Sequence, residues 1–97
     1  MKSVFIAFDQ AHKDAVIDIL DHLNCRGFSM VEQMQGRGSK TGEPHYGSHA
    51  WASMNSGIIT MVEDSVVKRL LEEIKNLDES AQMLGIRAFV WNVEQYY

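Results

Sequence analysis

The chain has 97 residues, of which 45% are hydrophobic and 23% charged, with a formal net charge of −4. This length supports one hydrophobic core rather than two domains, and the composition excludes wholesale disorder. The negative charge, without a cluster of lysines and arginines, excludes nucleic acid as an expected direct partner. No apolar run approaches the roughly 20 residues that span a bilayer, so membrane insertion is not expected. Because Cys25 is the only cysteine, a reducing, cytoplasmic location is expected.

The first half of the chain predicts a strand, a helix and a second strand. Residues 3–8 are rich in β-branched and aromatic side chains and contain no breaker, which predicts a strand rather than a signal peptide. From about 11 to 24, apolar residues recur at helical spacing, and Gly27 is the predicted stop for this helix. Residues 28–35 alternate between apolar and polar side chains, which predicts a half-buried strand.

The second half begins with a long loop. Residues 36–57 hold five of the seven glycines and the only proline, and loops of this length are usually functional. Residues 57–63 predict a third strand, and Asp64 is the predicted N-cap of a second amphipathic helix, because its carboxylate can accept free backbone N–H groups. Residues 78–84 are predicted to form a connector before a last strand over 86–93.

The predicted order of elements is βαββαβ. Two helices on one face of an antiparallel sheet give a ferredoxin-like α+β sandwich, here a single domain over 1–97 with a long insertion at 37–55. The strands at 3–8 and 86–93 are apolar at successive positions, not at alternate ones. A strand that is apolar on both sides is normally buried on both sides. The sequence therefore predicts an oligomer in which the uncovered sheet faces pack together.

Enzyme motifs are sparse in this sequence. It contains no nucleophile elbow, Walker loop, HExxH or CxxC pattern. Cys25 and His22 are three residues apart, but such neighbours are common by chance, and a structural cysteine is the preferred interpretation. No catalytic residue is therefore predicted, and the protein is not expected to be an enzyme.

Two parts of the central loop carry residue types that bind ligands. Residues 36–42 combine glycines with two cations, which suits a phosphate-bearing ligand, although a flexible solvated loop explains the same residues. His45 and His49 lie four apart near Glu43, which suits a transition metal such as Zn, Ni or Cu. Two histidines are too few for a closed metal site, and ordinary surface histidines remain the alternative. Trp51 either anchors the loop or contacts a partner.

With these features in place, the sequence resembles the nitrogen-regulatory P-II signalling proteins and their P-II-like relatives. The resemblance covers nearly the whole chain. The residues that carry it are 13–16, 27–29 and 31–32, the Gly-rich segment 36–42, the Tyr46-Gly47 pair and the Val62-Glu63-Asp64 segment. In this comparison the segment 36–42 is similar to the base of the family's T-loop, and Val62-Glu63-Asp64 is similar to the start of its second helix.

The resemblance implies a homotrimer that senses a small effector in clefts between subunits and contacts a target protein through the T-loop. A membrane transporter is one candidate target, and nitrogen regulation is the implied process. Tyr46 and Trp51 are the residues expected to contact the target. The resemblance also implies a set of residues for the ligand cleft. These are Phe28, Ser29, Gly36, Arg37, Gly38, Ser39, Lys40, Glu63 and Gly85.

The sequence also departs from the family. Where the family has a second phosphate-binding loop, Thr-Gly-x-x-Gly-Asp-Gly-Lys, residues 78–85 keep only Gly85 of the glycines, lack the lysine and add two acids. The family's closing pair of arginines has no counterpart before Tyr97. Fewer cations and more carboxylates weaken a triphosphate site. The effector is therefore left open between an adenine nucleotide at a weakened site and a transition metal ion. The alternative function is a CutA-like or efflux-associated metal-binding protein that uses His45 and His49.

Overall fold

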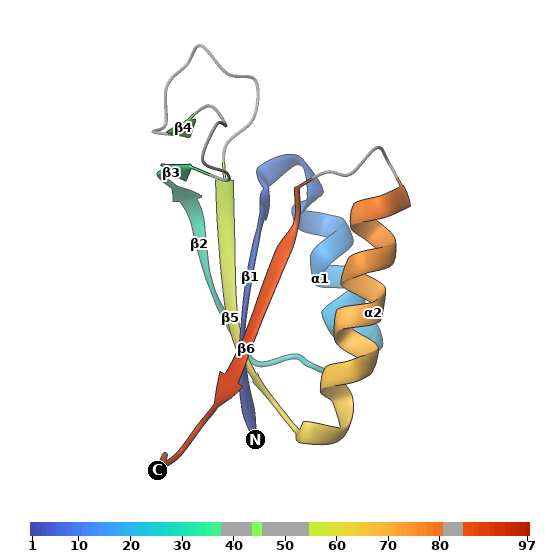
Figure 1. The fold of residues 1–97 in the computed structure, drawn as a ribbon, viewed down its shortest axis with the longest axis vertical. Helices are drawn as coiled ribbons and strands as arrows, with labels where there is room; N and C mark the ends of the chain where they lie inside the picture. Colours follow the sequence, from blue (N-terminus) through green and yellow to red (C-terminus); the bar gives the residue numbers. More distant parts are fainter. Residues whose placement is uncertain (38–43, 46–54, 81–84) are drawn as a thin grey trace.

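A computed structural model describes residues 1–37, 44–45, 55–80 and 85–97. Figure 1 shows the elements in chain order. They are β1 (Lys2–Asp9), a short 3-10 helix η1 (Gln10–His12), α1 (Lys13–His22), β2 (Phe28–Met34), β3 (Gly36–Arg37), β4 (Pro44–His45), β5 (Asn55–Val62), α2 (Asp64–Ser80) and β6 (Arg87–Asn92). No helix in these ranges is long and apolar enough to cross a membrane.

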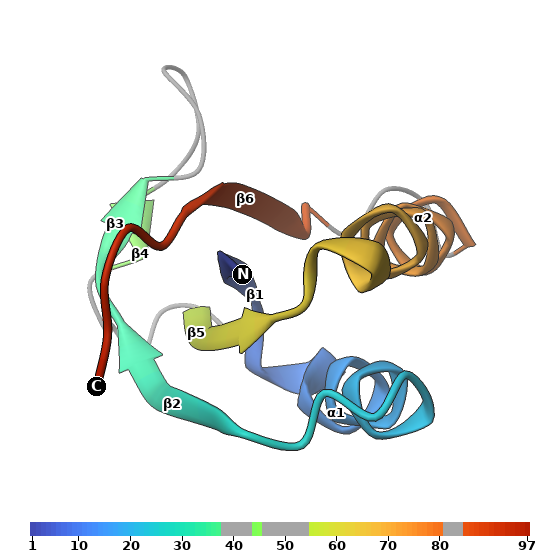
Figure 2. The same cartoon turned by 90° about the horizontal axis from the view of Figure 1, so that it is seen from below.

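Four strands form one antiparallel sheet in the order β2-β5-β1-β6, and β3 pairs with β4 in a separate two-stranded ribbon. At the centre of the sheet, Phe5 lies opposite Ile59 on one side and opposite Phe89 on the other. Both helices lie on the same face of the sheet, which Figure 2 shows from below. The predicted ferredoxin-like βαββαβ sandwich is confirmed.

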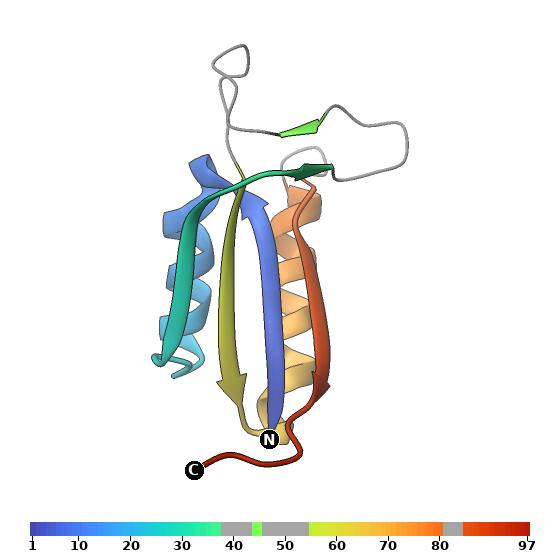
Figure 3. The same cartoon turned by 90° about the vertical axis from the view of Figure 1, so that its left-hand side faces the viewer.

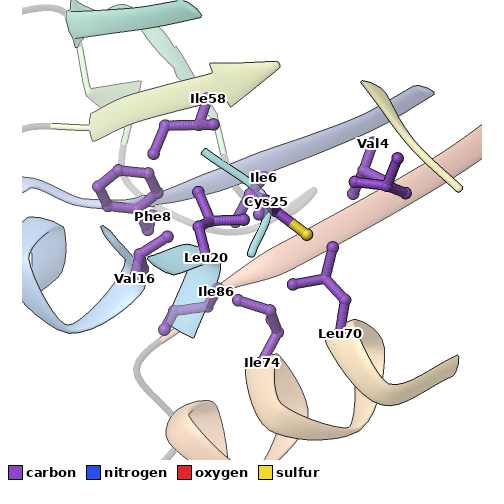
Figure 4. Packing of buried hydrophobic residues seen from close by; sticks show 11 residues of the cluster. Val4, Ile6, Phe8, Val16, Leu20, Cys25, Ile58, Leu70, Ile74 and Ile86 are labelled. Atoms are coloured by element: carbon purple, nitrogen blue, oxygen red, sulfur yellow. The ribbon is translucent and has the colours of Figure 1, made fainter. Parts of the chain in front are cut away.

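The core lies between the sheet and the two helices. On β1, Val4, Ile6 and Phe8 are almost completely buried, because alternate side chains of a strand point to the same face. They meet apolar side chains from both helices, from β5 and from the start of β6 (Figure 4). The other members of this cluster are Val16, Leu20, Cys25, Ile58, Val62, Leu70, Ile74 and Ile86.

In the described part of the chain, no helix lies on the opposite face of the sheet (Figure 3). Apolar side chains also occupy this face. Ile59 and Phe89 flank Phe5 in one cross-strand row, and Met61 and Trp91 flank Ser3 in the next. The large apolar side chains on this side are about half exposed, and the Phe5 and Phe89 rings stack with their centroids 6.5 Å apart. We call this surface the open face and define it by Phe5, Val31, Ile59, Met61, Phe89 and Trp91.

The end of α1 differs from the prediction. The helix ends at His22 instead of continuing to residue 24, and Gly27 does not stop it. The left-handed residue is Asn24, whose φ is 62°, and the amide of Cys25 donates to the carbonyl of Leu20. Asparagine tolerates this conformation better than most residues, so it ends the helix where a glycine was expected.

Three other predicted boundaries also shift. Asp64 is the first residue of α2 and not its N-cap. Its carboxylate lies 2.8 Å from the N-terminal amine of Met1, and this hydrogen-bonded pair holds the pKa of Asp64 below its usual range. At its other end α2 continues to Ser80, so the first three residues of the predicted connector 78–84 are helical. The predicted loop 36–57 contains β3 and β4, and β5 already begins at Asn55.

Gly57 lies in β5, and the side chains of Met34 and Phe5 meet above it on the open face. A Cβ at this position would lie 2.7 Å from the Met34 sulfur and 2.9 Å from a ring carbon of Phe5. The missing side chain therefore gives room for Phe5 and Met34 to pack over β5. At Gly27, in the turn before β2, an added Cβ would meet nothing within 4 Å.

We expect Gly57→Val to destabilise the protein by about 1–3 kcal/mol, because overpacking forces Phe5 and Met34 to move. Urea unfolding followed by circular dichroism measures this change. Gly27→Val is the matched control, since its side chain would enter open space. Equal unfolding midpoints for the two variants would contradict this account of the packing.

Candidate ligand-binding site

The residues predicted to bind a ligand fall into two groups at opposite ends of the sheet. We call Phe28, Ser29 and Glu63 the lower group, because the start of β2 and the end of β5 are the lower ends of these strands in Figure 1. Phe28 lies opposite Thr60, and Glu63 directly follows the end of β5. We call Gly36, Arg37 and Gly85 the upper group. They adjoin the other end of the sheet, where Met34 pairs with Asn55 and Arg87 pairs with Ala7.

The separation of the two groups follows from the length of β5. From Gly57, near the upper end, to Glu63 the chain advances by six residues at about 3.3 Å each, or about 20 Å. The groups cannot meet within one copy of the chain, because a straight, paired strand lies between them. A ligand that contacts both groups therefore needs the lower group of one copy and the upper group of another.

The lower group is held in position by hydrogen bonds between β5 and the start of β2. The hydroxyl of Thr60 donates to the carbonyl of Gly27 at 2.7 Å, which fixes the turn that leads into Phe28. Phe28 is half-buried against the core, whereas Ser29 and Glu63 are exposed. The result is a surface with an apolar ring, a hydroxyl and a carboxylate at one end of the sheet.

In the upper group, the two-stranded ribbon brings two predicted sites together. Gly36 lies opposite His45, and Arg37 lies opposite Pro44. The base of the predicted phosphate loop is therefore adjacent to one of the two predicted metal ligands. The remaining predicted residues, Gly38, Ser39, Lys40, Tyr46, His49 and Trp51, lie outside the described residues. In the described ranges no three His, Cys, Asp or Glu side chains gather as a metal site, and the His45–His49 site stays a prediction.

The connection between α2 and β6 contains an arrangement that the sequence did not predict. Asp78 is 8% exposed, and its carboxylate accepts the backbone N–H groups of Gly85, at 2.7 Å, and Ile86, at 2.9 Å. Arg87 Nη1 lies 3.5 Å from the other carboxylate oxygen. Gly85 adopts a φ of 84°, which favours glycine. The sequence placed Asp78 in a connector, and only the structure, by extending α2 to Ser80, shows an acid in the last turn of a helix, where cations are the usual residues.

Cys25 does not form a nucleophilic pair with His22. The thiol is buried and lies 3.7 Å from the carbonyl oxygen of Leu23, and burial raises its pKa. A raised pKa lowers the fraction of reactive thiolate at neutral pH. His22 is exposed at the end of α1. This environment matches a structural cysteine, as the sequence indicated.

The family model described as "Nitrogen regulatory protein P-II" matches residues 1–97, and the chain belongs to this family. The solved structures similar to it include CPII from Thiomonas intermedia K12, a nitrogen regulatory PII-like protein bound to ADP, AMP and bicarbonate. That likeness has a TM-score of 0.73 and 25% identity, and it covers 95% of this chain and 88% of CPII. Apo CPII gives a TM-score of 0.73 at 23% identity, covering 95% and 87%.

A PII-like signaling protein from Thermus thermophilus shares the fold, with a TM-score of 0.67, 22% identity and coverage of 95% and 85%. No curated protein sequence matches the chain. Proteins of the P-II family are regulatory proteins rather than enzymes. The resemblance seen in the sequence is thereby confirmed at the level of family and fold.

We expect Thr60→Val to lower the free energy of unfolding by about 1–2 kcal/mol, because the Gly27 carbonyl loses its hydrogen bond. The same change should speed hydrogen exchange at the amides of residues 28–30, measured by NMR. Ser56→Ala is the matched control, since it removes a similar bond from β5 to β2, from Ser56 to the carbonyl of Glu32, at the upper end. Equal exchange at residues 28–30 in the two variants would contradict a local role for Thr60.

Proposed function

We propose that the protein is a P-II-like regulatory homotrimer. It binds a small effector, an adenine nucleotide, in clefts between subunits, and it contacts a target protein through residues 37–55. The single observation that carries this proposal is the division of the predicted binding residues into two groups about 20 Å apart along one sheet. A divided site of this kind is useful only when copies of the chain assemble and bring complementary groups together.

The open face supplies a reason for the copies to assemble. Its exposed side chains include Phe89 at 54% and Trp91 at 50%, next to Met61 at 52%. Contiguous apolar surface of this kind normally marks an interaction site. Three copies that pack their open faces around a common axis would bury it. In a closed ring with head-to-tail contacts, each cleft lies between two different surfaces of neighbouring copies. Such a cleft can combine the upper group of one copy with the lower group of the next.

The chemistry of the two groups suits an adenine nucleotide. The glycine N–H groups of the upper group and its one cation, Arg37, favour a phosphate, since backbone amides and positive charge both attract anions. The lower group offers the Phe28 ring, the Ser29 hydroxyl and the Glu63 carboxylate, which can accept hydrogen bonds from amino or hydroxyl groups. CPII, which has the same fold, is described as bound to ADP and AMP. We extend this ligand class to the present chain as part of the proposal.

The segment 37–55 is proposed to contact the target protein through Tyr46 and Trp51. Aromatic residues are frequent anchors at protein interfaces. The target is expected to be a protein regulated by effector binding, for which a membrane transporter is one candidate. A cytoplasmic location belongs to the same proposal, because a single cysteine is typical of a reducing compartment.

The assembly is tested by placing a charge on the open face. The wild-type protein should sediment as a trimer at micromolar concentration, and Phe89→Glu should sediment as a monomer, because burying an unpaired carboxylate is unfavourable. Asn76→Glu is the matched control, since it adds the same charge at an exposed position of α2. A monomeric wild type, or a trimeric Phe89→Glu variant, would contradict the proposed assembly.

Ligand binding is tested by calorimetry with AMP, ADP and ATP. Ser29→Glu should weaken ADP binding at least about tenfold, equivalent to about 1.4 kcal/mol, because the larger side chain obstructs the lower group and its charge must be desolvated beside the nucleoside. The variant should remain a trimer, and Asn76→Glu should bind like the wild type. The proposal fails if the wild-type trimer binds none of the three nucleotides, or if Ser29→Glu binds ADP with unchanged affinity.

A further inference from the structure

The Asp78 carboxylate is held by groups that proteins commonly use to bind a free anion. The N–H groups of two consecutive residues, Gly85 and Ile86, point at the same oxygen atom. The guanidinium of Arg87 lies beside the second oxygen, at 3.5 Å. Successive backbone amides around a residue with positive φ form an anion-binding concavity, and an adjacent guanidinium strengthens it.

The helix itself does not explain a carboxylate at this position. Asp78 lies in the last turn of α2, where the helix dipole disfavours negative charge. It is nevertheless among the few buried polar residues in the part of the chain that the structure describes. The favourable contacts come instead from the start of β6, so the carboxylate is oriented toward the amides of the connection.

Space for a larger anion lies next to this carboxylate. A hollow of about 200 Å³ opens between α2 and β6, and its lining includes Lys75, Asp78 and Arg87 among apolar neighbours. Lys75 and Arg87 are both exposed to solvent, so an anion that approached the hollow would meet two cations. Asp78 lines this hollow, and its carboxylate already accepts hydrogen bonds from the backbone amides of Gly85 and Ile86.

We propose that the backbone amides of Gly85 and Ile86, together with Arg87, form an anion-binding site that the chain fills with its own Asp78 carboxylate. The ligands that this site would take in place of Asp78 are small carboxylate or phosphate anions. While Asp78 is present, it excludes them from the amides of Gly85 and Ile86. Removing the Asp78 carboxylate converts a filled site into an open one.

This arrangement has a consequence for nucleotide selectivity, and that consequence rests on the proposed function. Gly85 belongs to the upper group, which is proposed to contact the phosphates. Because the amide of Gly85 already donates to Asp78, the second phosphate of ADP gains little binding free energy from this part of the cleft. The wild-type protein is then expected to discriminate weakly between ADP and AMP, whereas a protein without the Asp78 carboxylate favours ADP.

The site is tested by chemical rescue of Asp78→Ala. The variant should melt several degrees below the wild type, because the Gly85 and Ile86 amides lose their acceptor. Sodium formate, acetate or phosphate should restore most of this loss in a saturable manner, since ligands that bind only the folded state stabilise it. Sodium chloride at equal ionic strength should not. If the variant unfolds without added anions, refolding in formate but not in chloride supports the same conclusion.

Two further variants separate a specific site from a general salt effect. Asp78→Asn keeps an oxygen acceptor for both amides, so its stability should respond to formate no more than that of the wild type. Glu73→Ala removes another carboxylate of α2, which pairs with Arg69 at 3.3 Å. Its loss should not be restored by formate. Rescue of Glu73→Ala equal to that of Asp78→Ala, or no rescue of Asp78→Ala, would overturn the proposed site.

The nucleotide consequence has its own measurement. Calorimetry should show that Asp78→Ala raises the affinity for ADP relative to AMP by about tenfold, the effect of one charge-assisted contact. An unchanged ratio together with intact rescue by formate would contradict the nucleotide consequence and support the anion site. Absence of all nucleotide binding in the wild type would contradict the proposed function, while the formate experiment would still decide the anion site.

Discussion

The structure depends on a sheet that has two apolar faces and helices on only one of them. Val4, Ile6 and Phe8 point from β1 into the core beneath α1 and α2, and every intervening side chain of that strand points to the open face. Burial of apolar surface is the main favourable term in folding, at about 25 cal/mol per Å². One face of the sheet is buried by the helices of its own protomer and is stabilised in this way. The open face, with Phe89 and Trp91 half exposed, gains this stabilisation only when a further surface covers it, and we propose that this surface belongs to another copy of the chain.

The same sheet explains why the candidate site is divided. A straight strand cannot bring its own ends together, so the lower group around Ser29 and the upper group around Gly36 stay about 20 Å apart. Assembly through the open face would convert this separation into clefts shared by neighbouring copies. Beside each upper group, Asp78 adds a constraint of its own, because its carboxylate accepts two backbone N–H groups. We propose that an external anion would otherwise bind these amides. If the proposed site is correct, sheet packing and ligand selectivity both depend on the ends of the same strands.

Much of the fold was predictable from the sequence, because periodicity is a local signal that tertiary packing reinforces. The strands and both helices follow from it, whereas the family was inferred from the resemblance of segments such as 36–42 and Val62-Glu63-Asp64. The boundaries were less predictable, since they depend on single contacts: Asn24 ends α1 in place of Gly27, and α2 continues past Asp78. The role of Asp78 could not be predicted, because the amides that it accepts lie seven and eight residues away and only the turn at Gly85 brings them close. Its sequence position suggested only a lost phosphate loop.

The most direct test of the central claim is to mix two variants that each lack one half of the site. Ser29→Glu damages the lower group, and Arg37→Glu damages the upper group. Each variant alone should bind ADP poorly. After joint unfolding and refolding at equal amounts, roughly a quarter of the clefts should combine two intact halves and recover wild-type affinity, as expected for random assembly of a cyclic trimer. Recovery of this size would support a site shared between copies. A mixture that binds no more ADP than the separate variants would contradict it.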